Sequence, residues 1–137
     1  MKKVKIEDNK IIKIGKNLNT DGVEKIIDAT NKIVMPGLIN THAHIPMSIF
    51  RETVDGYNLQ DWLNKKIWPM EDKLTSEDIY NASILSFIEM IKTGTTTIND
   101  MYFMTEDIIK AAKETKIRLQ TSRTLMGKDD EEGKNRR

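Results

Sequence analysis

The chain has 137 residues, the length of one ordinary domain, and contains no cysteine and only two histidines. The lack of cysteine excludes disulfides and thiolate metal sites. Lys and Arg number 22 and Asp and Glu number 21, and this balance argues against nucleic-acid or membrane-surface partners. No apolar run approaches the ~18 residues of a membrane-spanning helix. Charged residues interrupt any signal sequence near the N-terminus, so we expect a cytoplasmic protein.

The sequence pattern of residues 1–35 predicts short strands. The apolar stretches around Val4 and Ile12 flank a turn signal at Asp8 and Asn9, which is typical of a β-hairpin. Residues 25–28 predict a third short strand. Three short strands bury little apolar surface, so we expect this part of the chain to need a partner surface.

From residue 36 onward the pattern alternates between strands and helices. The first of these elements is a buried strand over residues 38–44, which follows a Pro-Gly break. A loop over residues 46–57 comes next. The elements expected after it are a helix over 58–67 that ends at Pro69, a helix from Thr75 to Gly94, a strand over 95–102, a helix from a Thr105 cap to about residue 115, and a strand over 117–125. This order predicts βαβ units around a parallel sheet.

The two histidines, His42 and His44, lie at the C-terminal end of the strand predicted over residues 38–44. Side chains two positions apart on a strand point to the same face, so both imidazoles suit one metal ion. Parallel α/β folds place their sites at this end of the strands. Taken alone, the pair is equally compatible with two ordinary structural histidines.

Three further polar residues are candidates for the same site. Glu71 could accept hydrogen bonds from the hydroxyls of a ligand, although its sequence context favours a solvated acid. Arg123, near the end of the last predicted strand, could clamp an anion or a hydroxyl group, or could be a surface arginine. Asp100 could support a metal ligand, but a cap for the loop before the next helix is the favoured interpretation.

The stretch from Ile33 to His44 reads IVMPGLINTHAH and resembles the first barrel strand of the amidohydrolase superfamily. Residues 61–63 (DWL), 67–71 (IWPME), 94–97 (GTTT) and 100–102 (DMY) resemble the methylthioadenosine/S-adenosylhomocysteine deaminases and their chlorohydrolase-like relatives. The resemblance extends over nearly the whole chain. It implies an α/β fold in which residues 36–137 form the N-terminal part of a metal-dependent (β/α)₈ TIM-type barrel, preceded by part of a small β-sandwich in residues 1–35.

The same resemblance implies an activity and a set of site residues. The activity is hydrolytic deamination of adenosine-type nucleosides with release of ammonia. His42 and His44 match two ligands of one divalent metal ion, with zinc expected first and iron, nickel or manganese as alternatives. Glu71 matches the acid that contacts the ribose hydroxyls, and Arg123 matches an arginine of the substrate pocket. A second pocket arginine aligns near Lys134 or Arg136.

A (β/α)₈ barrel takes roughly 250 residues, so the chain accounts for about its first three strands. In the family the other metal ligands and the proton-transfer residues lie on later strands. We therefore assign no catalytic acid or base to this chain and expect it to be an inactive piece of a larger enzyme. The alternatives are guanine deamination, triazine dechlorination or a non-catalytic truncated product. Open sheet edges also predict homo-oligomers or other association.

Overall fold

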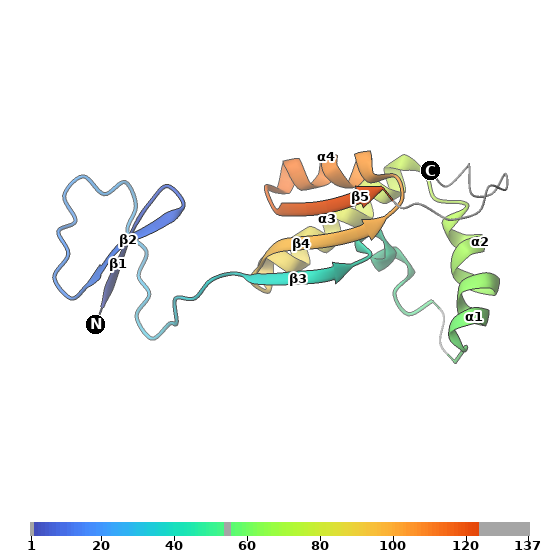
Figure 1. Ribbon diagram of the computed structural model, residues 1–137, viewed down its shortest axis with the longest axis horizontal. Helices are drawn as coiled ribbons and strands as arrows, with labels where there is room; N and C mark the ends of the chain where they lie inside the picture. Colours follow the sequence, from blue (N-terminus) through green and yellow to red (C-terminus); the bar gives the residue numbers. More distant parts are fainter. Residues whose placement is uncertain (1, 54–55, 124–137) are drawn as a thin grey trace. The chain divides into compact units, whose positions relative to one another are not determined.

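The computed structural model describes residues 2–53 and 56–123, with only the backbone described at Arg123. The chain divides into two compact units, Met1–Pro36 and Gly37–Arg137. Figure 1 shows their helices and strands. Among the helices of the described residues, none combines the length and the apolar character that crossing a membrane requires.

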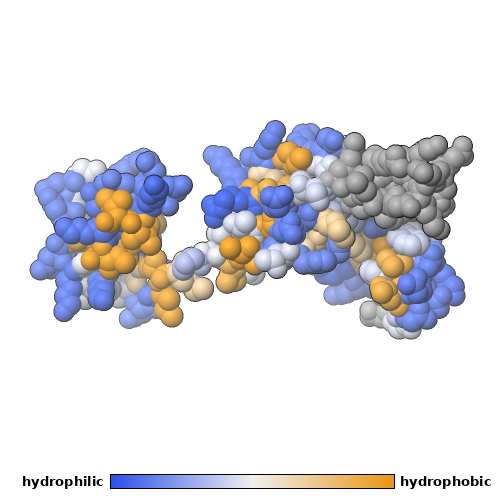
Figure 2. Space-filling model, in the orientation of Figure 1, coloured by the Kyte–Doolittle hydropathy of each residue, from blue (hydrophilic) through white to orange (hydrophobic). Residues whose placement is uncertain are grey.

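The first unit contains an antiparallel hairpin of β1 (Lys3–Glu7) and β2 (Lys10–Gly15), as predicted. Asp8 has a φ of 53° in the connecting turn, a conformation that Asp tolerates better than most residues. The third strand predicted over residues 25–28 is wrong, because that stretch joins no sheet. A strand requires a ladder partner, and local apolar residues do not supply one. Apolar side chains are visible on this unit (Figure 2), and four of its isoleucines are 46–59% exposed: Ile6, Ile11, Ile12 and Ile14.

The second unit contains a parallel sheet in the order β3 (Leu38–Ala43), β4 (Thr95–Tyr102) and β5 (Arg118–Arg123). Helix α3 (Ser76–Lys92) connects β3 to β4, and α4 (Thr105–Thr115) connects β4 to β5. Both helices lie on the same face of the sheet (Figure 1). The strand–helix alternation predicted from residue 38 onward is therefore confirmed within the described residues. The prediction that the first of these strands is buried is wrong, because Leu38 and Ile39 are 51% and 66% exposed and Ala43 is the one buried residue of β3.

The core of this unit lies between the sheet and the two helices. On β4, Ile98, Asp100 and Tyr102 are buried, whereas the intervening Asn99 and Met101 are exposed. This alternation is the strand period of two, with one face turned toward the helices. The buried apolar cluster also takes side chains from β3, from both helices and from their connections: Ala43, Ile45, Ile79, Phe87, Ile108, Ala111, Ala112 and Ile117.

Capping interactions explain the limits of α3. Thr75 and Asp78 form the predicted N-terminal cap, in which each side chain bonds to the backbone of the other residue. Gly94 follows the helix with a φ of +93°, which favours glycine. Its carbonyl accepts the N–H of Leu38 at 2.9 Å and so joins the end of the helix to β3.

Gly37 explains the Pro-Gly break before β3. A Cβ atom at this position would lie 2.2 Å from Cγ2 of Thr96 on the neighbouring strand. The absence of a side chain at Gly37 therefore leaves room for the side chain of Thr96. The start of α4 differs from the prediction, because Thr105 is the first helical residue and Met104, with a φ of 50°, occupies the cap position.

The connection between β3 and α3 is more helical than the sequence suggests. The loop predicted over residues 46–57 contains a 3₁₀ helix, η1 (Ile45–Phe50). A continuous helical segment then runs through α1 (Leu59–Trp62), the π-helical turn η2 (Leu63–Ile67) and α2 (Trp68–Glu71). The prediction that Pro69 ends the helix is wrong. The N–H of Trp68 bonds to the carbonyl of Leu63, and the wider turn brings Pro69 to the start of α2, where it needs no N–H.

Candidate metal centre and polar site

His42 and His44 come together at the C-terminal end of β3. His42 lies on the strand and is exposed, whereas His44 follows the strand, precedes η1 and is half-buried. The two Nε2 atoms are 3.2 Å apart, and the rings meet edge to face. Two nitrogens that each lie roughly 2.0–2.1 Å from one tetrahedral zinc ion are about 3.3 Å apart. The spacing therefore fits two ligands of a single ion.

A backbone contact orients the ring of His44. Its Nδ1 lies 2.6 Å from the carbonyl oxygen of Met101, at the end of β4. A carbonyl oxygen only accepts hydrogen bonds, so Nδ1 carries the proton and donates it. In the neutral imidazole this leaves the lone pair on Nε2, the atom that faces His42. Metal-binding histidines typically have such a partner on the second nitrogen.

Asp100 supports the turn that follows His44, and it does so from the helix side of the sheet. Its side chain is buried, and Oδ1 accepts the N–H of Ile45 at 2.8 Å, directly after His44. Burial raises the pKa of Asp100, while the Ile45 hydrogen bond and the nearby His44 ring act in the opposite direction. Oδ2 makes no hydrogen bond within the described residues. The interpretation of Asp100 as a cap before α4 is therefore wrong, because its bond is to the turn after β3.

Glu71 is the last residue of α2 and is only 8% exposed. Its Oε1 accepts the hydroxyl of Tyr102 at 2.7 Å, from the C-terminal end of β4. The sequence-based preference for a solvated acid is therefore wrong, because the carboxylate is buried and bound to the sheet. Sequence reasoning did not single out Tyr102. Its signal is the period of two that runs from Ile98 through Asp100 to Tyr102 and turns all three side chains toward the same face.

Three consecutive residues of β4 thus organise this end of the sheet. Asp100 holds the turn after β3, the carbonyl of Met101 orients a histidine, and Tyr102 bonds to Glu71. The contacts join segments 31 to 57 positions apart in the chain. The arrangement brings a histidine pair and a carboxylate to one end of a parallel sheet, where α/β proteins bind ligands.

The described residues form no complete metal site. Within residues 2–53 and 56–123, no third His, Cys, Asp or Glu joins the two histidines in a group that could hold an ion. The backbone of Arg123 pairs in register with Tyr102, at this same end of the sheet. The Arg123 side chain lies outside the described residues, as do Lys134 and Arg136.

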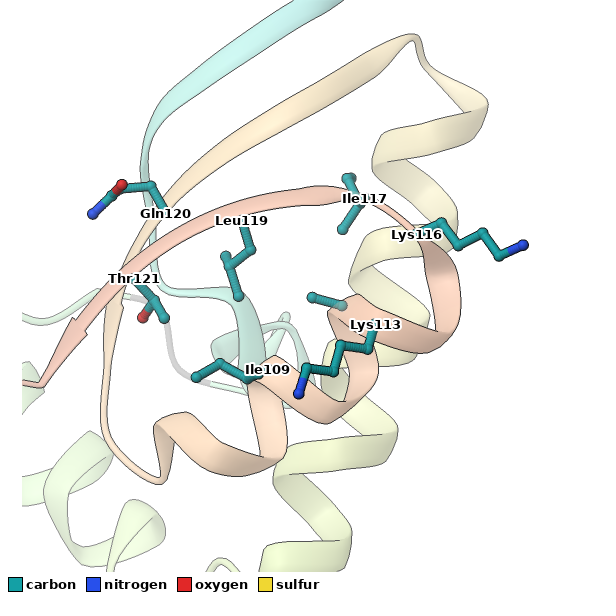
Figure 3. Close-up of a pocket in the computed structure, with 8 residues that line it drawn as sticks. Ile109, Lys113, Lys116, Ile117, Leu119, Gln120 and Thr121 are labelled. Atoms are coloured by element: carbon teal, nitrogen blue, oxygen red, sulfur yellow. The ribbon is translucent and has the colours of Figure 1, made fainter. Parts of the chain in front are cut away.

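A separate groove of about 390 Å³ lies between α4 and β5 (Figure 3). Leu119 and Thr121 point into it from the strand, whereas Gln120 points away. The hydroxyl of Thr121 is buried and makes no hydrogen bond within the described residues. Neither the histidines nor Glu71 line this groove, so it is distinct from the polar site.

The sequence profile of the amidohydrolase family matches residues 33–137, which include β3, β4, β5 and both histidines. The chain belongs to the amidohydrolase family. The resemblance of the Pro-Gly and His-Ala-His segment to this family is therefore confirmed.

Two relatives carry the names of nucleoside deaminases. A 5-methylthioadenosine/S-adenosylhomocysteine deaminase of Carboxydothermus hydrogenoformans is 48% identical, over 93% of this chain and 30% of the relative. A 5′-deoxyadenosine deaminase of Methanococcus aeolicus is 51% identical, over 93% of this chain and 31% of the relative. The chain thus spans somewhat under one third of the length of these relatives.

Solved structures of the same family resemble the chain. An adenosine deaminase of Xanthomonas campestris, crystallised with bound zinc, is 35% identical with a TM-score of 0.60, over 62% of this chain and 20% of that one. A triazine hydrolase of Arthrobacter aurescens is 27% identical with a TM-score of 0.75, over 88% of this chain and 31% of that one. The α/β character predicted from the sequence agrees with these neighbours.

Proposed function

We propose that this chain is part of a metal-dependent hydrolase that deaminates adenosine-type nucleosides, with 5-methylthioadenosine and S-adenosylhomocysteine as substrates. The observation that carries the proposal is the 3.2 Å approach of the His42 and His44 Nε2 atoms at the end of β3. The names of the 48% and 51% identical relatives support the same reaction class. In this reaction water replaces the 6-amino group of the purine, and ammonia leaves.

His42 and His44 would hold one divalent ion, with zinc expected first and iron, nickel or manganese as alternatives. The chemistry that such an ion supplies when bound is the ionisation of water near neutral pH. The proton on Nδ1 of His44, held by the Met101 carbonyl, supports this role because it leaves Nε2 as the donor atom. The other ligands and the proton-transfer groups would come from parts of the full-length protein other than residues 1–137.

Glu71 and Arg123 would contact the substrate rather than the ion. The buried carboxylate of Glu71 would accept hydrogen bonds from the ribose hydroxyls. Arg123 would donate to a polar group of the nucleoside from the end of β5. Support for both roles comes from the location of the two residues. Glu71 bonds to Tyr102, and the backbone of Arg123 pairs with Tyr102. Tyr102 follows Met101, whose carbonyl contacts His44.

We extend the proposal to the fold of the full-length protein. Residues 36–137 would form the first three strands of a TIM-type barrel, and residues 1–35 would contribute to a small β-sandwich. The exposed isoleucines of the hairpin support a partner surface for the first unit. The isolated chain would also tend to associate through the open edges of its sheet.

The test is a substrate panel with the full-length protein. Methylthioadenosine, S-adenosylhomocysteine and 5′-deoxyadenosine are compared with guanine and a chlorotriazine, and ammonia or chloride release is measured. We expect ammonia from the adenosine-type nucleosides and inosine-type products. Release from guanine or the triazine alone would overturn the proposal. The triazine hydrolase structure makes dechlorination the second candidate, but its 27% identity lies well below that of the deaminase relatives.

The 137-residue chain by itself would lack activity, because its described residues supply two ligands and no third. Metal analysis of the purified chain checks this directly. Substoichiometric, weakly held zinc is expected. One tightly bound zinc per chain would contradict the view that the isolated chain has an incomplete site.

A further inference from the structure

We propose that Tyr102 is a positioning residue that holds Glu71 for the recognition of a vicinal diol, and that it sets a preference for ribonucleosides over 2′-deoxynucleosides. The inference rests on the proposed function. Its starting point is the hydrogen bond of 2.7 Å from the Tyr102 hydroxyl to Oε1 of Glu71. The two residues are only 5% and 8% exposed, so water competes little for this bond.

Tyr102 provides a rigid anchor for the bond. Its ring belongs to the buried cluster between the sheet and the helices and stacks on Phe103, with ring centroids 4.3 Å apart. Its backbone pairs with Arg123 on one side of β4. The preceding residue, Met101, accepts the hydrogen bond of His44. The Tyr102 hydroxyl therefore has a fixed position relative to the histidine pair.

Glu71 comes from a less regular part of the chain. It ends α2, a helix of four residues that follows a π-helical turn and contains Pro69. A glutamate side chain has three rotatable bonds, and a carboxylate that turns freely recognises hydroxyl positions poorly. The bond to Tyr102 restricts this rotation and fixes the carboxylate relative to the end of the sheet at which His42 and His44 lie.

The chemistry of the bond suits diol recognition. A phenol that donates to a carboxylate forms a charge-assisted hydrogen bond, which is stronger than a neutral one. A carboxylate has about four acceptor sites, and the Tyr102 hydroxyl occupies one of them. One carboxylate can therefore accept from a phenol and from sugar hydroxyls together. A carboxylate held for two hydroxyls binds a sugar that lacks one of them less well, because an acceptor then loses its partner.

The experiment uses the full-length protein with the Tyr102→Phe substitution, which keeps the packing ring and removes only the hydroxyl. The kcat/KM is measured for a 5′-modified adenosine and for its 2′-deoxy analogue. We expect the ribo-to-deoxy ratio to fall about tenfold, through a higher KM for the ribonucleoside. The kcat and the metal content should stay unchanged. Tyr80→Phe is the matched control, because the Tyr80 hydroxyl also bonds to a carboxylate, that of Glu114, at a surface contact between α3 and α4.

The outcomes separate this inference from the function on which it rests. An unchanged ribo-to-deoxy ratio in Tyr102→Phe overturns the positioning role, and so does an equal loss on both substrates. If Tyr102→Phe does not fold, Glu71→Asp is measured instead. This substitution keeps the negative charge but shortens the side chain, which withdraws the carboxylate from the Tyr102 hydroxyl. An unchanged ribo-to-deoxy ratio in Glu71→Asp also overturns the inference. Failure of the unmodified protein to deaminate either nucleoside overturns the proposed function itself, and the inference with it.

Discussion

His44 and Met101 are separated by 57 positions in the chain, yet Nδ1 of the first lies 2.6 Å from the backbone oxygen of the second. The contact joins the end of β3 to the end of β4, strands that are neighbours in the parallel sheet. Because the acceptor is backbone, no side-chain substitution at residue 101 removes it. The orientation of the histidine therefore depends on the register of the two strands.

Removal of either histidine should abolish tight metal binding by the full-length protein. Each imidazole would supply one ligand, so His42→Ala or His44→Ala should weaken zinc affinity by at least about 100-fold. Zinc per protein is measured by elemental analysis after dialysis against a weak chelator. Ser76→Ala, a surface substitution at the start of α3, provides the control and should retain its zinc. Full zinc occupancy in both histidine variants would contradict the assignment.

Asp100 should influence metal affinity through the turn that follows β3. Asp100→Ala removes the acceptor of the Ile45 N–H, so we expect zinc affinity of the full-length protein to fall about 10–100-fold. Asp100→Asn keeps an acceptor oxygen of the same shape and should lose much less. Chelator competition measures both variants. Equal losses would indicate that the charge of Asp100, and not its hydrogen bond, is what matters.

Gly37→Ala should destabilise the second unit. The new Cβ would meet Cγ2 of Thr96 at 2.2 Å, and overpacking of this kind costs about 1–3 kcal/mol. Urea unfolding of the chain, monitored by circular dichroism, measures the loss. In the background of Thr96→Ala the same substitution should cost less, because part of the clash is gone. Equal costs in the two backgrounds would mean that the close contact is not the cause.

The cap of α3 should make the stability of the chain depend on pH. Hydrogen bonds from the side chain and backbone of Thr75 lower the pKa of Asp78. A group whose pKa is lowered on folding stabilises the protein above its unfolded pKa, and this contribution is lost as the pH falls through the folded value. Asp78→Asn should therefore reduce the melting temperature at pH 7, and the difference from the unmodified chain should shrink below about pH 4.

Glu77→Gln is the matched control for that experiment, because Glu77 lies in the same acidic first turn but outside the capping pair. Its effect on the melting temperature at pH 7 should be smaller than that of Asp78→Asn. A difference for Asp78→Asn that is constant from pH 7 to pH 3 would contradict the role of its ionised carboxylate.

Local sequence patterns determined much of this protein. Alternating apolar residues and capping signals predicted the order of strands and helices from Leu38 onward, because such patterns act within a few residues. The spacing of His42 and His44 predicted that both rings would serve one face. The same local signals were wrong at Pro69, where a π-helical turn accommodates the missing N–H.

Only the tertiary structure decided which residues meet at the end of the sheet. Nothing near Glu71 in the sequence indicates its burial, because its partner Tyr102 lies 31 positions later. The partner of Asp100 is likewise the turn 55 positions earlier, not the helix that follows it. Chain topology and strand register determine these contacts, and residues far apart in sequence carry no local pattern that records them. The sequence alone therefore identified the histidine pair, and folding determined what orients it.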